Sequence, residues 1–124
     1  MRSDDRILLK NMVFYGYHGV FSAEKELGQR FEVDVEMVTD LSQGSQADDM
    51  DLTVNYVDVY TLVKDIVEER EFSLIEALAE TIAQEILSAY DLREVTVRVR
   101  KPHAALGGVL DYVQVEITRG KPAI

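Results

Sequence analysis

Two carboxylates, a phenol and a lysine lie where the pattern of this sequence changes from one type of secondary structure to another. Glu24 follows a segment with two glycines, Tyr56 and Glu76 each lie at the start of an apolar helical pattern, and Lys101 directly precedes Pro102. Ends of helices and strands are where a rigid scaffold presents reactive side chains to a ligand. These residue types can remove and return a proton, and they can accept hydrogen bonds from a polar ligand.

Lys101 is the candidate proton carrier. Pro102 favours an extended backbone at the lysine and withholds a backbone donor, which fixes Lys101 at the end of a strand. A lysine can act as a general base when its pKa falls towards neutrality, through burial or through a neighbouring positive charge such as Arg98 or Arg100. The alternative is a solvated lysine at a strand end.

Glu76 has two interpretations that the sequence leaves open. Ser73 and Glu76 have the spacing of a capping box, in which a hydroxyl and a carboxylate bond the unpaired N–H groups of the first helical turn. A carboxylate at a helix start, walled by Leu74, Ile75 and Leu78, can also accept two hydrogen bonds from the flat amidine-like edge of a ligand. The first role is structural and the second is binding.

The composition excludes several classes of partner and chemistry. A net charge of -10 disfavours nucleic acid and anionic membranes, and the absence of cysteine removes disulfides and thiolate chemistry. No phosphate-binding loop, dinucleotide fingerprint or nucleophilic-serine motif occurs, so we expect no cofactor. No apolar run approaches the roughly 20 residues that span a bilayer, and no signal-like segment opens the chain, so we expect a cytoplasmic protein.

The two histidines make a weak case for a metal site. Catalytic zinc sites usually carry three protein ligands, whereas this chain offers His18 and His103 without cysteine. We therefore expect no metal. His18 lies between glycines and is expected to fix its loop through backbone hydrogen bonds.

The secondary structure that must position these groups follows from the apolar spacing. Two segments have the period of amphipathic helices: one begins after a cap at Asn55 and ends near Glu68, and the other covers residues 72–87. Residues 22–28 and 41–52 are expected to be connections. Four segments read as strands, with the first largely buried, and they are residues 6–15, 29–40, 95–100 and 113–118.

The order of these elements predicts a single α+β domain over residues 1–124. Two strands, two helices and two strands (ββααββ) give an antiparallel four-stranded sheet with both helices on one face. The other face carries acids and arginines at alternate positions, which predicts cross-strand ion pairs on a wet surface. Long edge strands without proline invite pairing, so we expect a ring-like homo-oligomer whose sheets close a barrel, with the helices outside.

Several short motifs, spread from Ile7 to Arg119, are specific in combination. They are Phe14-Tyr15-Gly16-Tyr17-His18-Gly19-Val20 with Glu24, Gly28-Gln29-Arg30-Phe31, Asp48-Asp49, Thr53-Val54-Asn55-Tyr56, Leu74-Ile75-Glu76 with Leu78-Ala79-Glu80, and Lys101-Pro102. Together they resemble the dihydroneopterin aldolases of folate biosynthesis. The resemblance implies the tunnelling fold, in which tetrameric barrels stack into a homo-octamer with active sites between neighbouring subunits.

The resemblance also implies a reaction. A retro-aldol cleavage converts 7,8-dihydroneopterin into 6-hydroxymethyl-7,8-dihydropterin and glycolaldehyde. Most aldolases stabilise the carbanion with a lysine Schiff base or a zinc ion, whereas the ring imine of a pterin can itself take the electrons. Such a lyase is metal-independent and needs only proton carriers.

The resemblance assigns roles to the candidate residues. Glu76 becomes the anchor of the pterin ring, with backbone groups near Val54 and Ile75 completing the contact with its edge. Lys101 becomes the acid and base, and Tyr56 of an adjacent subunit assists proton transfer.

In the same resemblance, Glu24 binds near the trihydroxypropyl end of the substrate.

One departure from the family pattern follows Lys101-Pro102. Many members continue with a small residue and Ala-Pro-Ile-Pro, whereas this chain has His103-Ala104-Ala105-Leu106-Gly107-Gly108. We expect a looser loop that alters closure over the substrate or the preferred pterin side chain.

Two alternatives remain open: a related dihydroneopterin triphosphate epimerase, which should need a cationic patch for the phosphates, and a non-catalytic pterin-binding oligomer. Epimerisation could also accompany cleavage, through the same intermediate.

Overall fold

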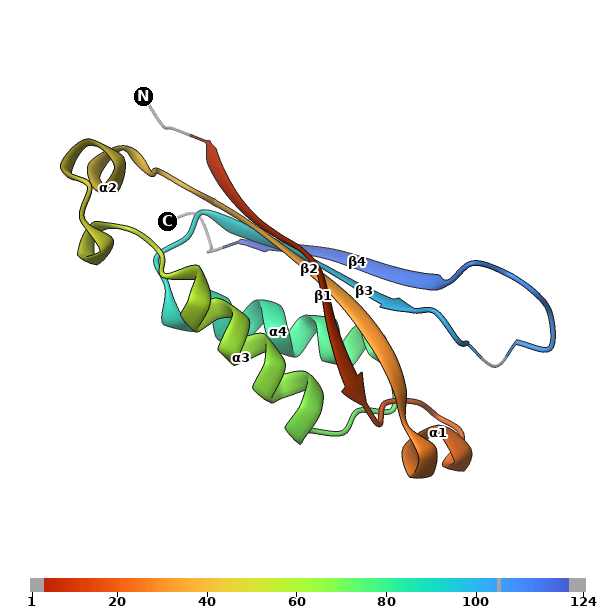
Figure 1. Ribbon diagram of the computed structural model, residues 1–124. Coiled ribbons are helices and arrows are strands. Elements are labelled where there is room, and N and C mark those ends of the chain that lie inside the picture. Colours follow the sequence, from red (N-terminus) through yellow and green to blue (C-terminus); the bar gives the residue numbers. More distant parts are fainter. Residues whose placement is uncertain (1–3, 105, 121–124) are drawn as a thin grey trace.

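The fold is a four-stranded antiparallel sheet with two long helices on one face (Figure 1). The computed structural model describes residues 4–104 and 106–120. The strands are paired in chain order, and they are β1 (Asp5–Gly16), β2 (Gln29–Thr39), β3 (Glu94–Lys101) and β4 (Val113–Gly120). The helices are α3 (Tyr56–Glu69) and α4 (Ile75–Ala89). The predicted ββααββ order is confirmed, and β1 and β4 are the edges of the sheet.

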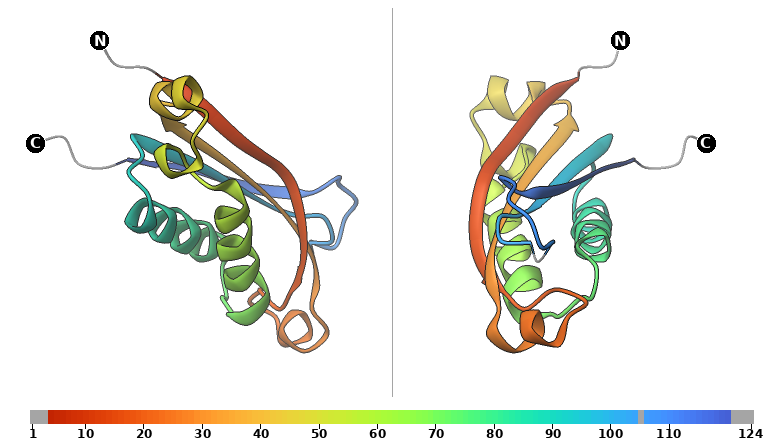
Figure 2. Two further views of the ribbon diagram at one scale, coloured as in Figure 1. Left: turned by 60° about the vertical axis from the view of Figure 1, so that its left-hand side comes forward. Right: turned by 90° about the vertical axis from the view of Figure 1, so that its right-hand side faces the viewer.

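Both long helices bury an apolar stripe against the sheet, and Figure 2 shows them on the same side of it. α3 begins where the Asn55 side chain accepts a hydrogen bond of 3.0 Å from the Val57 N–H, so the predicted cap is confirmed. The facing strand β2 contributes core residues at alternate positions, all fully buried: Phe31, Val33, Val35 and Met37. None of the helices in the described ranges is both long and apolar enough to cross a membrane.

Short helices occupy two segments that the sequence predicts as connections. They are α1 (Ser22–Leu27) and the pair α2 (Ser42–Ala47) and η1 (Met50–Leu52), and Figure 1 shows α1 and α2 at opposite ends of the sheet. Local hydrogen bonds stabilise these turns: the Asp49 side chain, for example, accepts from the Asp51 N–H at 3.0 Å. A single turn needs no apolar stripe, so periodicity does not reveal it.

β1 contains a bulge that the sequence analysis did not predict. The register with β2 shifts between Leu9 and Met12, and Asn11 has a left-handed φ of 56°. The inserted residue changes the core-facing positions from odd to even numbers. Leu8 and Val13 are consequently 50% and 51% exposed, so the prediction of a largely buried first strand is wrong at these two positions.

The face of the sheet opposite the helices carries the predicted cross-strand ion pairs. Arg98 lies 2.7 Å from Glu116, and Arg100 lies 2.7 Å from Asp34. The expectation of a wet surface fails at the second pair, because Asp34 is fully buried and Arg100 is only 5% exposed. This buried pair joins β2 to β3.

Candidate active site

A cleft of about 260 Å³ lies where the β1–α1 loop, the start of α4 and the ends of β3 and β4 meet. It brings together most of the predicted site residues, namely Glu24, Ile75, Glu76 and Lys101. The rest of its wall is mainly apolar and consists of Val20, Phe21, Ser73, Leu74, Ala104, Leu106, Val113 and Val115. An apolar cleft with a few convergent charged groups is the usual form of a small-molecule site.

Lys101 and Glu24 form an ion pair in this cleft, with side chains only 15% and 9% exposed. Lys101 is the last residue of β3 and lies opposite Val113 of β4. Glu24 is held by the Phe21 N–H at 3.2 Å and by the Gln29 side-chain amide at 3.3 Å. Both ends of the pair are therefore fixed before a ligand arrives.

The carboxylate of Glu24 is ionised at neutral pH. Burial alone raises the pKa of Glu24, but hydrogen bonds from Lys101, the Phe21 amide and Gln29 outweigh burial and lower it below its ordinary value. The expected positive neighbours of Lys101 are not there, because Arg98 and Arg100 pair with carboxylates on the opposite face of the sheet. Among the described residues, the ionic partner of Lys101 is Glu24.

Glu76 is not a helix cap. α4 begins at Ile75 with Leu74 as its N-cap residue, and no side chain caps it. Ser73 instead accepts a hydrogen bond of 3.1 Å from Lys25 of α1, so the predicted capping box is wrong. Within the described ranges the Glu76 side chain makes no hydrogen bond or ion pair, and the residue is exposed in the cleft wall. Its carboxylate remains available to a ligand.

His18 fixes its loop as predicted. Its Nε2 lies 2.8 Å from the Val67 carbonyl oxygen, and its Nδ1 accepts a hydrogen bond of 3.1 Å from the Phe72 N–H. His103 is exposed at the start of the loop after β3. The part of the chain that the structure describes holds no group of three or more His, Cys, Asp or Glu arranged to bind a metal ion.

Val54 and Tyr56 do not line this cleft. They line a separate hollow of about 380 Å³, together with Arg6, Ile7, Leu41, Gly44, Ser45, Met50 and Thr53. The Tyr56 side chain is 56% exposed there. One subunit therefore carries the predicted site residues on two distinct surfaces.

The family model described as dihydroneopterin aldolase matches residues 7–118. The chain belongs to the dihydroneopterin aldolase family. The predicted family membership is thereby confirmed, and with it the predicted enzyme class, an aldolase of folate biosynthesis.

Relatives and solved structures of dihydroneopterin aldolases cover nearly the whole chain. The Bacillus subtilis (strain 168) dihydroneopterin aldolase is 45% identical over 118 residues, 94% of this chain and 98% of that protein. An E. coli dihydroneopterin aldolase solved in complex with neopterin has a TM-score of 0.87 at 28% identity, covering 94% and 99% of the two chains. A Burkholderia thailendensis dihydroneopterin aldolase bound to guanine has a TM-score of 0.80 at 28% identity, covering 97% and 93%.

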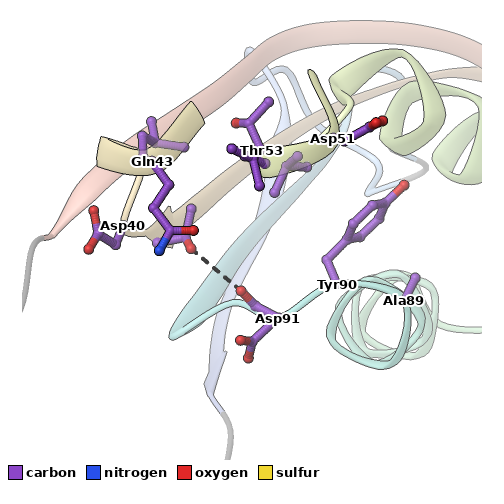
Figure 3. Close-up of a pocket in the computed structure, with 11 residues that line it drawn as sticks. Asp40, Gln43, Asp51, Thr53, Ala89, Tyr90 and Asp91 are labelled. Atoms are coloured by element: carbon purple, nitrogen blue, oxygen red, sulfur yellow. Dashed lines mark hydrogen bonds between the residues drawn. The ribbon is translucent and has the colours of Figure 1, made fainter. Parts of the chain in front are cut away.

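A larger hollow of about 520 Å³ lies at the other end of the sheet, and Figure 3 shows its polar lining with Asp40, Asp51 and Asp91. The Thr39 hydroxyl donates to the Asp91 carbonyl oxygen there, at 3.4 Å. Of the predicted site residues, only Val54 contributes to this lining. The charged residues predicted for the site, Glu24, Glu76 and Lys101, all line the smaller cleft.

Much of the apolar wall of that cleft was not among the predicted site residues. Val113 begins the predicted fourth strand, and the register of β3 with β4 places it opposite Lys101. Phe21 and Leu106 lie in loops without periodicity and gave no such signal. Leu106 and Ala104 bring the divergent loop into the cleft wall, while Ala105 lies outside the described residues. The effect of this loop on substrate preference stays a prediction.

Proposed function

We propose that this member of the family cleaves 7,8-dihydroneopterin into 6-hydroxymethyl-7,8-dihydropterin and glycolaldehyde. One observation carries the proposal: the Lys101–Glu24 ion pair and the unpaired carboxylate of Glu76 face the same apolar cleft of about 260 Å³. The pair can move protons, and the free carboxylate can anchor a heterocycle. We further propose that the enzyme acts in the cytoplasm.

Glu76 binds the ring of the substrate. Its carboxylate accepts one hydrogen bond from the exocyclic amine of the pterin and one from the adjacent ring N–H, a bidentate arrangement that fixes orientation as well as affinity. Leu74 and Ile75 supply the apolar walls beside the ring. Neopterin and guanine, found in the two related structures, share an edge with an exocyclic amine, an adjacent ring N–H and a carbonyl, which supports the assignment. Backbone groups near Ile75 and Val54 complete the contact.

Lys101 and Glu24 act on the trihydroxypropyl chain. Glu24 accepts hydrogen bonds from its hydroxyls, and Lys101, after giving its ammonium proton to solvent, removes the proton of the C2′ hydroxyl as the neutral amine. The C1′–C2′ bond then breaks, C2′ and C3′ leave as glycolaldehyde, and the electron pair passes from C1′ into the ring imine. Return of a proton to C1′ completes 6-hydroxymethyl-7,8-dihydropterin.

The complete site forms between copies of the chain. Val54 and Tyr56 line a different hollow from Lys101, so they reach the substrate from a neighbouring subunit. There the Tyr56 hydroxyl assists proton transfer at the substrate side chain. The edge strands β1 and β4 offer the unpaired backbone groups that close a barrel of subunits. We propose two stacked tetramers, a homo-octamer.

The charge of the cleft favours the aldolase over a triphosphate epimerase. Among its described lining residues Lys101 is the only lysine or arginine, and Glu24 already neutralises it. A triphosphate needs several cations or donors. Epimerisation of the unphosphorylated substrate can accompany cleavage when glycolaldehyde adds back to the same intermediate.

The test is to incubate chelator-treated protein with 7,8-dihydroneopterin and to quantify both products. We expect glycolaldehyde and 6-hydroxymethyl-7,8-dihydropterin in equal amounts. Release of no glycolaldehyde contradicts the aldolase and favours a pterin-binding oligomer. Faster turnover of the triphosphate than of the free substrate favours the epimerase, and activity lost to the chelator contradicts metal independence.

A further inference from the structure

The two ligand-binding carboxylates of the cleft come from separate segments of the chain. Glu24 lies on α1, after the loop that follows β1, and Glu76 lies at the start of α4, after the connection from α3. Among the described residues, no hydrogen bond joins the side chains of Glu24 and Glu76, and they share no hydrogen-bond partner. Their separation, which must match the length of the substrate, therefore depends on how the loop packs against the connection.

His18 lies at this junction and is fully buried. The Phe72 nitrogen carries a proton, so the Nδ1 that it faces at 3.1 Å must be the unprotonated acceptor. The remaining proton is then on Nε2, which donates to the Val67 carbonyl oxygen at 2.8 Å. The ring also contacts Phe31 and Phe72, with centroid distances of 5.0 and 5.6 Å. The tautomer of a neutral imidazole is thus set by its two backbone partners.

The same junction touches Glu24 on its other side. The Gly19 N–H donates to the Phe72 carbonyl oxygen at 3.0 Å, so residues 18 and 19 bond both polar backbone groups of Phe72. A Cβ atom added to Gly19 would overlap the Glu24 carboxylate, so the glycine backbone runs directly against that side chain. One short stretch of loop therefore contacts Glu24 and also holds the segment that leads to Glu76.

The surroundings keep the imidazole neutral. Burial lowers the pKa of His18 below its ordinary value, while the hydrogen bond to Val67 and the negative charge of Glu71 oppose this shift and the positive charge of Lys101 adds to it. A protonated ring could not accept from the Phe72 N–H. The acceptor is accordingly retained at neutral pH.

We propose that His18 is a positioning residue of the aldolase, whose Nδ1 holds the Phe72 N–H and thereby sets Glu76 opposite the Glu24–Lys101 pair. This inference rests on the proposed function. The two hydrogen bonds of the ring have different consequences. The bond to Val67 anchors the loop to α3, whereas the bond to Phe72 fixes the path of the chain into α4.

Two amide variants separate these bonds. The Asn oxygen of His18→Asn takes the place of Nδ1 and keeps the acceptor for Phe72, whereas the Gln amide of His18→Gln takes the place of Nε2 and keeps the donor to Val67. We expect neopterin to bind His18→Gln roughly 10-fold more weakly than the parent protein, and to bind His18→Asn within about 3-fold of it. A purely structural role predicts equal losses of affinity, and that result overturns the inference.

A measurement on the unaltered protein does not depend on how the variants fold. Coupling is reciprocal, so a hydrogen bond that favours pterin binding is itself stabilised by bound pterin. We expect neopterin to slow hydrogen exchange of the Phe72 amide more than that of the Arg93 amide, which donates to Val38 at 2.9 Å. Equal slowing of both amides overturns the inference alone. Failure of the parent protein to bind neopterin overturns the proposed function as well.

Discussion

The carboxylate of Asp34 and the guanidinium of Arg100 face each other across β2 and β3 in two hydrogen bonds of 2.7 and 2.8 Å. Asp34 also accepts from the Asn11 N–H at 2.8 Å, which holds the bulge of β1. Arg100 reaches Gln114 of β4 at 3.1 Å. One buried pair therefore ties all four strands together at the residue before Lys101, and so supports the site from the opposite face of the sheet.

Removing the cation of this pair should be costly. Arg100→Met removes both hydrogen bonds that the guanidinium makes with buried Asp34, and of the ionic contacts it leaves the carboxylate only the longer ones with Lys10 and Arg98. We expect the free energy of unfolding to fall by about 3–5 kcal/mol. Arg98→Met is the matched control, because Arg98 is more exposed, its shortest ion pair is with the exposed Glu116, and it lies 4.0 Å from Asp34. We expect that variant to lose about 1 kcal/mol or less. Urea unfolding at one protein concentration measures both, and equal losses contradict the prediction.

The same pair should make stability depend on pH. Burial alone raises the pKa of Asp34, but hydrogen bonds from Arg100, the Asn11 amide and Lys10 outweigh burial and hold it well below its ordinary value. A lowered folded-state pKa stabilises the protein above the unfolded-state pKa of about 3.9, and this contribution is lost as the pH falls. The stability difference between the parent and Asp34→Asn should therefore be constant from about pH 5 to about pH 8 and shrink below about pH 4. A difference that widens on acidification contradicts this.

The fold was predictable because its signals are local. The alternation in β2 and the helical period in α3 and α4 each identify a buried face without knowledge of the rest of the chain. The bulge in β1 was not predictable from its own sequence. Asn11 adopts its left-handed conformation where Asp34 and Arg100, from β2 and β3, provide hydrogen-bond partners.

The site was predictable in its residues but not in their contacts. Ends of elements pointed to Lys101 and Glu76, and the family motifs assigned their roles. The capping box failed because a tertiary partner, Lys25 of α1, takes the Ser73 hydroxyl. The pairing of Glu24 with Lys101 joins residues far apart in sequence, and no local pattern encodes such a contact.

Lys101 should be needed for turnover and not for binding. We expect Lys101→Ala to lower kcat by roughly 10²–10⁴-fold, the usual contribution of a positioned acid or base. The Kd for neopterin should change little, because Glu76 still holds the ring. Lys64→Ala removes an exposed lysine of α3 that does not line the cleft, and it should keep full activity. Steady-state kinetics measures kcat and a neopterin titration measures Kd. A Lys101→Ala variant with the kcat of the parent protein refutes the assigned role.

Glu76 should be needed for binding and not for stability. Replacement of a charge-assisted, bidentate contact by Glu76→Ala should raise the Kd for neopterin by roughly 10–100-fold. Because Glu76 caps nothing, the free energy of unfolding should change by less than about 0.5 kcal/mol. Glu68→Ala, on α3, is the control for loss of one exposed acid. Unchanged affinity together with lost stability would return Glu76 to a structural role.

Glu24 should keep its charge across the physiological pH range. Its lowered pKa means that the ion pair with Lys101 is present above the ordinary carboxyl value of about 4.3 and is lost only as the pH falls further. When kcat/KM is plotted against pH, titration of Glu24 should therefore add no step between about pH 5 and about pH 8. Glu24→Gln should lower this profile without changing its shape in that range. A step near neutrality that disappears in Glu24→Gln contradicts the prediction.

If the site forms between subunits, two inactive variants with defects in different surfaces should regain activity when they assemble together. Lys101→Ala damages the cleft, whereas Tyr56→Phe damages the separate hollow that holds Val54 and Tyr56. Co-refolded mixtures of the two variants contain some sites that combine an intact cleft with an intact tyrosine, so their activity should exceed the mean of the two variants alone. Mixtures of Lys101→Ala with Glu24→Gln provide the control, because both changes lie in one cleft and no arrangement of subunits repairs it. Activity equal to the mean in both mixtures would place the complete site within a single subunit.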